Sequence, residues 1–190
     1  MLRTNDAFLT FTEALYQQQA SKENIVRKNF PAGSLLFRQG TSSTKVLIIA
    51  SGITKCFISE ENDKDFIVEF LGKGEIAGEI EAIRSIKCLC NITALTTVTA
   101  YVIPIPFFKE LLAKHPPFQQ LLLEELAERI INTSTRAATQ QLYTVEYGLT
   151  RLLAFQEKQQ LAVSKEDMAA YLGIAVRSLN RVLKGMNRPE

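Results

Sequence analysis

Short apolar segments separated by turn residues fill the first two thirds of the chain and predict strands. Glycines or small polar clusters interrupt these segments about every ten residues, the spacing typical of antiparallel sandwiches and rolls. The predicted strands are residues 34–38, 46–50, 53–58, 65–71, 90–95 and 98–103. Pro104 and Pro106 follow the last of them and end the roll.

Helical periodicity precedes and follows the predicted strands. Near the N-terminus, Phe8, Phe11 and Leu15 recur at helical spacing among polar residues. A later segment, 118–141, contains neither glycine nor proline. The expected helices are residues 1–28, 107–114, 118–141 and 145–159.

The longest expected helix carries an apolar seam. Its members alternate steps of three and four residues, which is coiled-coil spacing. They are Leu123, Leu126, Ile130, Thr133 and Ala137. Leu121 and Leu122 lie off the seam, where they can pack on the roll. The seam could be internal core, but we favour a dimer interface, because proteins that read two DNA half-sites are generally dimers.

The last thirty residues predict a helix, a tight turn and a second helix. Ser164 is a good N-cap for the first helix, and Gly173 supplies the positive φ that ends it. The second helix buries Val176, Leu179, Val182 and Leu183. Its other face carries Arg177, Arg181, Lys184 and Arg188, with no acid from Ile174 to Arg188. A helix-turn-helix presents such a face to the DNA major groove, although a helical hairpin with a solvated basic face has the same pattern.

Net charge and the length of the apolar runs limit the classes of protein to which the chain can belong. A net charge of +2 does not indicate nucleic-acid binding by the whole chain, so any such signal is confined to the C-terminal basic face. No apolar run approaches the ~20 residues needed to span a bilayer. The first residues lack the apolar core of a signal peptide. We therefore expect a cytoplasmic protein without a membrane partner.

The three cysteines and the single histidine do not predict a metal site. Cys56, Cys88 and Cys90 are too few for a disulfide framework or an iron–sulfur cluster, and His115 lies beside two prolines. Small buried side chains are the simplest interpretation. A redox-sensing pair formed by Cys88 and Cys90 is the alternative.

In this order of elements the chain resembles the Crp/Fnr family of transcription regulators. The matching segments are Phe30–Gly40, Ile49–Ile53, the glycine-rich Leu71–Glu79 and Ser164–Lys184. The resemblance implies an α+β fold in three parts. These are a cyclic-nucleotide-binding-like antiparallel β-roll with flanking helices (1–116), a dimerisation helix (117–141) and a helix-turn-helix DNA-binding domain of winged-helix type (142–190). The family's β-hairpin wing has no counterpart before Glu190, so either it is absent or the sequence is cut short.

The resemblance also implies an effector site in the phosphate-binding cassette. Gly78 and Glu79 match the pair whose amide and carboxylate contact the phosphate and the ribose. Cys88 and Leu89 stand where the family has the arginine and serine that hold the cyclic phosphate. They offer no fixed cation, so we expect the effector not to be cyclic AMP and leave its identity unknown.

Two further pairs belong to this expected effector site. Arg84 and Ser85 lie near the cassette and could hold a phosphate only if the loop is remodelled. Thr133 and Ser134 resemble the hydroxyl pair that faces the purine in the cyclic-AMP branch.

At the DNA end, the resemblance assigns base contacts to Val176, Arg177 and Arg181. Arg181 matches an arginine that the family commonly keeps, and arginine reads guanine through two hydrogen bonds. Val176 and Arg177 differ from the cyclic-AMP branch, so the sequence read must differ. Phosphate contacts are expected from Ser164, Ser178, Lys184 and Arg188.

These observations predict a homodimeric, sequence-specific DNA-binding regulator. Its expected partners are double-stranded DNA, a second copy through residues 117–141, and RNA polymerase. Two alternatives are a cyclic-nucleotide-responsive regulator and a ligand-sensing module that binds a protein instead of DNA. An enzyme is not expected, because no nucleophile–base pair or metal cluster is present, and Gly72-Lys73-Gly74 is too short to cradle a phosphate.

Overall fold

Two sheets folded into a roll form the N-terminal part of the computed structural model, which describes residues 2–19, 23–62 and 64–186. One sheet has the order β1-β6-β5-β8-β3 and the other β2-β9-β4-β7. All described ladders are antiparallel except β1 with β6. The strands are β1 (Leu2–Arg3), β2 (Val26–Phe30), β3 (Leu35–Phe37), β4 (Lys45–Ser51), β5 (Thr54–Ser59), β6 (Asp65–Leu71), β7 (Ile76–Ala77), β8 (Asn91–Ala94) and β9 (Val98–Pro104).

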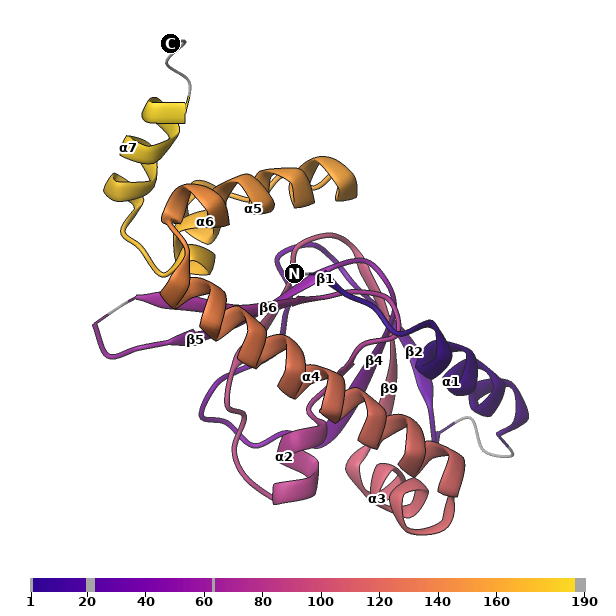
Figure 1. The fold of residues 1–190 in the computed structure, drawn as a ribbon. Coiled ribbons are helices and arrows are strands. Elements are labelled where there is room, and N and C mark those ends of the chain that lie inside the picture. Colours follow the sequence, from indigo (N-terminus) through magenta and orange to yellow (C-terminus); the bar gives the residue numbers. More distant parts are fainter. Residues whose placement is uncertain (1, 20–22, 63, 187–190) are drawn as a thin grey trace.

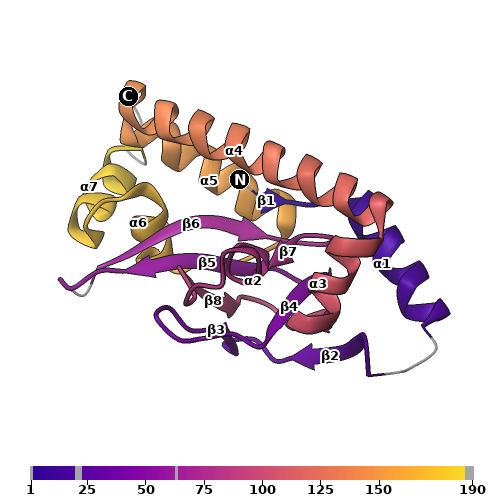
Figure 2. The ribbon, with the colours of Figure 1, turned by 90° about the horizontal axis from the view of Figure 1, so that it is seen from below.

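Helices flank the roll at its ends and along one side. They are α1 (Asp6–Gln18), α2 (Glu79–Arg84), α3 (Ile105–Lys114), α4 (Pro116–Leu142), α5 (Val145–Gln159), α6 (Lys165–Leu172) and α7 (Val176–Met186). The long helix α4 runs along the roll, from α1 and α3 at one end to α6 and α7 at the other (Figures 1 and 2). The α+β prediction is therefore confirmed.

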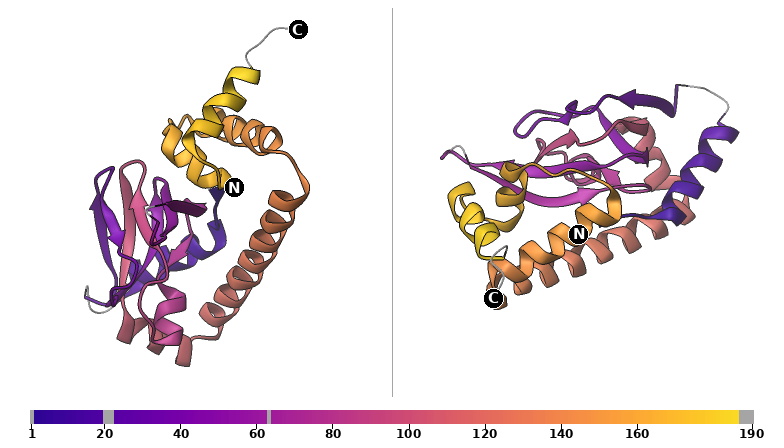
Figure 3. Two further views of the ribbon diagram at one scale, coloured as in Figure 1. Left: turned by 90° about the vertical axis from the view of Figure 1, so that its left-hand side faces the viewer. Right: turned by 90° about the horizontal axis from the view of Figure 1, so that it is seen from above.

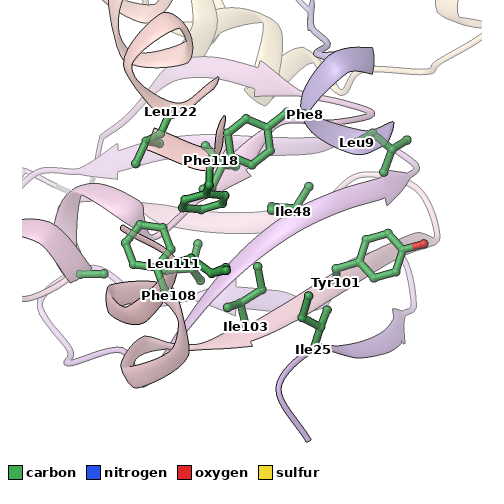
Figure 4. Packing of buried hydrophobic residues seen from close by; sticks show 13 residues of the cluster. Phe8, Leu9, Ile25, Ile48, Tyr101, Ile103, Phe108, Leu111, Phe118 and Leu122 are labelled. Carbon is green, nitrogen blue, oxygen red and sulfur yellow. The ribbon is translucent and has the colours of Figure 1, made fainter. Parts of the chain in front are cut away.

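Two apolar clusters build the roll and fix the start of α4. One fills the space between the sheets and includes Leu47, Leu71 and Val98. The other lies between the β4–β9 sheet and four helices, α1 to α4, where Phe118 of α4 contacts the rings of Phe8 and Phe108 at 5.6 and 5.7 Å (Figure 4). Edge-to-face pairs of this kind add about 0.5–1.5 kcal/mol each to simple burial.

The chain ends in a helical domain packed on the roll. Phe155 of α5 and Tyr171 of α6 stack on Phe70 of β6, with ring centroids 5.1 and 5.3 Å apart. A third apolar cluster surrounds these rings and includes Ile67, Leu152 and Val163. In side view, α4 links the roll to this domain as a single arm (Figure 3).

The expected helix over residues 1–28 is wrong at both ends. The helix spans only Asp6–Gln18, and Leu2–Arg3 and Val26–Phe30 are strands. Val26–Phe30 has no strand-like alternation, but its five residues pair with β9 from Val102 to Val98. Tertiary hydrogen bonding therefore decides its conformation. The six-residue helix α2 was also missed.

Two members of the predicted seam of α4, Leu126 and Thr133, do not belong to its exposed apolar face. Leu126 packs against the roll cluster, whereas Leu123 and Ile130 are 63% and 67% exposed. Leu122 is buried and Leu121 packs on the same cluster, as expected for residues off the seam. The exposed small and apolar residues form what we call the α4 stripe: Leu123, Ala127, Ile130, Ile131, Ser134, Ala137 and Ala138.

Candidate functional site

The C-terminal helix pair has the local geometry of a helix-turn-helix. The Ser164 hydroxyl oxygen accepts a hydrogen bond of 3.0 Å from the Asp167 amide, which caps α6. Gly173 follows with a φ of 68° and ends the helix. Leu149, Ala169 and Leu179, one from each of α5, α6 and α7, then form a buried core that holds α7 in place.

The outer face of α7 is a row of free cations. Arg177, Arg181 and Lys184 are exposed, and none has an ion pair within the described part of the chain. Val176 packs against the α5–α7 core and is half-buried, as is Ser178. Arg188 lies outside the described residues. An unneutralised row with this spacing matches a surface that binds phosphates and base edges.

The carboxylate of the cassette residue Glu79 is already paired with a cationic side chain of the same chain. The Arg129 guanidinium of α4 hydrogen-bonds to the Glu79 carboxylate and donates to the Ile76 carbonyl at 3.0 Å. Glu79 is only 1% exposed, and Gly78 before it has a φ of 88°, at which a Cβ would lie 2.8 Å from the Phe37 ring. The Glu79 carboxylate is therefore shielded from solvent.

A buried charge network extends from this pair. Arg3 lies 2.9 Å from Glu69 and 3.1 Å from Glu75, and it also binds Glu125 of α4. Two guanidiniums thus face four carboxylates: Glu69, Glu75, Glu79 and Glu125. Because burial disfavours the surplus negative charge, it raises the pKa of Glu75 to about 8. Burial lowers the pKa of Arg129, but the carboxylates outweigh it and raise this pKa above its ordinary value.

The remaining cassette residues do not converge on a phosphate-sized space. Leu89 is exposed, and its amide donates to a carboxylate oxygen of Glu81 at 2.9 Å. Cys88 is buried, and its amide donates to the Thr41 carbonyl at 2.8 Å. A carboxylate and a backbone carbonyl of the chain therefore occupy two amide donors that a phosphate would need.

Arg84 and Ser85 also stay apart from Glu79. Both are exposed, and the Ser85 hydroxyl lies 3.4 Å from the Lys109 ammonium. The hydroxyl pair on α4 is divided as well. Thr133 lines a cavity beside the C-terminal domain, whereas Ser134 lies in the α4 stripe.

The cysteines pair differently from the expected alternative. Cys90 exchanges a hydrogen bond with Cys56 of β5 rather than with Cys88. This bond lowers the pKa of Cys90 and, with burial, raises that of Cys56. Burial also raises the pKa of Cys88.

Neither a candidate metal-binding cluster nor a candidate membrane-spanning helix occurs among the described residues. Within the described ranges, no group of three or more histidine, cysteine or acidic side chains could hold a metal ion. No helix among the described residues is both long and apolar enough to cross a bilayer.

Known proteins resemble this chain both within the roll and over most of its length. Residues 27–115 match the family model of the cyclic nucleotide-binding domain. The HTH-type transcriptional regulator Cmr of Mycobacterium tuberculosis is 23% identical over 89% of this chain and 69% of its own length. The transcriptional activator protein Anr of Pseudomonas aeruginosa is 26% identical over 85% of this chain and 71% of its own. The chain is therefore similar to transcription regulators of the Crp/Fnr family over most of its length.

A solved structure agrees with this assignment at the level of the fold. A putative Crp/Fnr regulator from Eubacterium rectale superimposes with a TM-score of 0.77 at 17% identity, over 90% of this chain and 85% of that one. The Crp/Fnr relatives named here are transcription regulators, which confirms the prediction that this chain is not an enzyme.

The charge network that fills the cassette was not predicted from the sequence. Arg129 and Glu125 are one turn apart on the side of α4 opposite the stripe. Two charges on a face expected to pack on a roll are the signal that could have revealed them, because buried charges require partners. Arg3, which joins them, had no such signal.

Proposed function

We propose that the chain is a homodimeric, sequence-specific DNA-binding transcription regulator. Residues 1–116 form its sensing roll, 117–141 its dimerisation helix and 142–190 its DNA-binding domain. The observation that carries the proposal is the row formed by Arg177, Arg181 and Lys184, exposed and without acidic partners in the described structure. Such a regulator acts where bacterial DNA is, in the cytoplasm, and RNA polymerase is a further expected partner.

The α4 stripe supports the dimer. Leu123, Ile130 and Ile131 are 63%, 67% and 59% exposed and follow one another along a single face. A second α4 packed against this face would remove them from water. Two recognition helices related by that axis would read half-sites separated by one DNA turn, about 34 Å.

The filled cassette supports an effector other than cyclic AMP. Arg129 already neutralises Glu79, and the Glu81 carboxylate already occupies the Leu89 amide. A cyclic phosphate would have to displace the Glu81 carboxylate without gaining an arginine from the cassette. That exchange is unfavourable, because the phosphate would lose water without gaining a cation.

Selection of duplex DNA from a random pool tests the proposal. The purified chain is incubated with the pool in parallel arms with and without cyclic AMP. A motif with two-fold symmetry, enriched equally in both arms, is the expected result. Enrichment only with cyclic AMP would favour the cyclic-nucleotide-responsive alternative. No enrichment would favour the module that binds a protein.

Point variants then test the α7 row. Arg181→Ala should cost about 1–3 kcal/mol at one base position and relax the preference there. Arg84→Ala removes an equally exposed cation from α2 and should leave affinity for the selected site unchanged. If the Arg181 variant bound the site as tightly and as selectively as the parent, the role of this residue would be wrong.

A further inference from the structure

A cavity of about 360 Å³ lies where the roll, the long helix and the DNA-binding domain meet. Its walls come from β6 (Phe66, Val68), from α4 (Arg136, Gln140) and from α5 and α6 (Tyr147, Tyr171). None of the expected cassette residues from Gly78 to Leu89 lines it, although Arg3 and Glu69 of the charge network do. The volume is within the range of about 300–1,000 Å³ found for small-molecule sites.

Arg136 brings an unneutralised charge into this cavity wall. Its guanidinium donates to the carbonyls of Val68, on the roll, and Tyr171, on α6, the latter at 2.7 Å, and its Nε is buried without a hydrogen-bond partner. No carboxylate pairs with it among the described residues, and Glu69, the acid lining the same cavity, is held by Arg3 at 2.9 Å. Burial lowers the pKa of Arg136. Buried charges in proteins are ordinarily paired.

Aromatic rings flank this charge and a second one. The Arg136 guanidinium lies 4.1 Å from the Tyr171 ring centre and 5.0 Å from that of Phe66. Tyr143 and Tyr147 stack at 4.5 Å on another wall, with the Arg151 guanidinium 5.8 Å from the Tyr147 ring. Arg151 also has no ion pair within the described ranges. The cavity therefore combines flat apolar walls with two guanidiniums that lack carboxylates.

We propose that this cavity is the effector site of the regulator and that its effector is a small aromatic carboxylate. The inference rests on the proposed regulatory function. The ring stacks against the tyrosine side chains of the cavity wall, and the carboxylate pairs with guanidinium groups that the chain leaves unneutralised. This site is distinct from the filled cassette and lies between domains rather than within the roll.

Occupancy would act on the position of the DNA-binding domain. Arg136 joins Val68 of β6 to Tyr171 of α6, so it connects the roll with the first helix of the helix-turn-helix. A carboxylate that accepts from the same guanidinium competes with both carbonyls. The ligand would therefore shift the population away from the arrangement in which α6 is docked on β6.

Binding of naphthoate to the full chain, measured by isothermal titration calorimetry, tests the site without DNA. Naphthamide has the same ring system without the charge and is the matched ligand. We expect one naphthoate per chain and binding of naphthamide weaker by about tenfold or more. Equal binding of both ligands, or no naphthoate binding at millimolar concentration, would overturn the proposal.

Two arginine variants locate the site. Arg151→Gln, at an exposed position, should weaken naphthoate binding by about tenfold. Arg177→Gln, on α7 and outside the cavity, should leave it unchanged. Unchanged affinity in the Arg151 variant would refute the assignment. The result is separable from that of the DNA selection, because a chain that binds DNA but not naphthoate loses only this inference.

Discussion

At the scale of single residues, the buried network at the base of α4 makes the chain sensitive to pH. Glu75 has a pKa of about 8 in the fold because burial and neighbouring carboxylates favour its protonated form. The unfolded carboxyl ionises near its ordinary pKa of 4.5. Between these values the folded state holds a proton that the unfolded state has released. The free energy of unfolding therefore decreases as pH rises from about 4.5 to about 8.

Glu75→Gln should remove this pH dependence, because glutamine keeps the size of the side chain and cannot ionise. We expect thermal unfolding curves of the variant to show a smaller decrease in Tm between about pH 5 and about pH 8. Glu124→Gln alters an exposed carboxylate of α4 and should retain the parent profile. If the Tm of the Glu75 variant decreased with pH as steeply as that of the parent, another group of the network would hold the proton.

The cysteines offer a second test at this scale. The hydrogen bond from Cys56 lowers the pKa of Cys90, and Cys90 is the cysteine residue with the largest exposed fraction of the three. Since the thiolate is the nucleophile, iodoacetamide at about pH 8 should modify Cys90 before Cys56 or Cys88. Peptide mass spectrometry over time gives the order. Cys56→Ser should change the rate at Cys90, whereas faster modification of Cys88 in the parent would contradict the pairing.

At the scale of elements, the sequence was most informative where one face of an element is buried and its period is regular. The strand predicted at 65–71 and the helix predicted at 145–159 have the observed bounds, Asp65–Leu71 and Val145–Gln159. Elements defined by distant partners were missed. β2 has a polar sequence and depends on its ladder with β9, and Arg3 meets Glu125 across most of the chain. Neither local periodicity nor spacing carries that information.

At this scale, the role of the α4 stripe as a dimer interface can be tested with a charged substitution. Ile130→Glu places a charge in the middle of the proposed helix–helix interface, where it would be buried opposite its own copy. We expect the variant to sediment as a monomer at concentrations at which the parent is a dimer, because an unpaired buried charge costs several kcal/mol. Ala14→Glu, on the exposed side of α1, is the matched control and should stay dimeric. A dimeric Ile130 variant would exclude the stripe as the interface.

At the scale of the whole molecule, the docking of the DNA-binding domain on the roll is the feature that sequence reasoning did not anticipate. The aromatic stack on Phe70 and the contacts of Arg136 join segments that are far apart in the chain. Each segment alone is explained by its own amphipathic pattern. The docked arrangement holds α6 against the roll while the cations of α7 face outward, so a change at this interface can alter how α7 is presented to DNA.

The ion pair of Lys55 across this interface allows the docking of the domain to be tested. Its ammonium binds the Asp167 carboxylate, joining β5 to α6, and both side chains are largely buried. Lys55→Ala leaves that carboxylate without its cation, which should weaken docking by about 1–3 kcal/mol. Hydrogen exchange at the amides of α6 should then become faster by about an order of magnitude, because opening of the interface becomes more frequent. Lys87→Ala, an exposed cation on the roll, should leave exchange in α6 unchanged. If both variants exchanged at the parent's rate, the aromatic stack on Phe70 and the contacts of Arg136 would hold the domain without this ion pair.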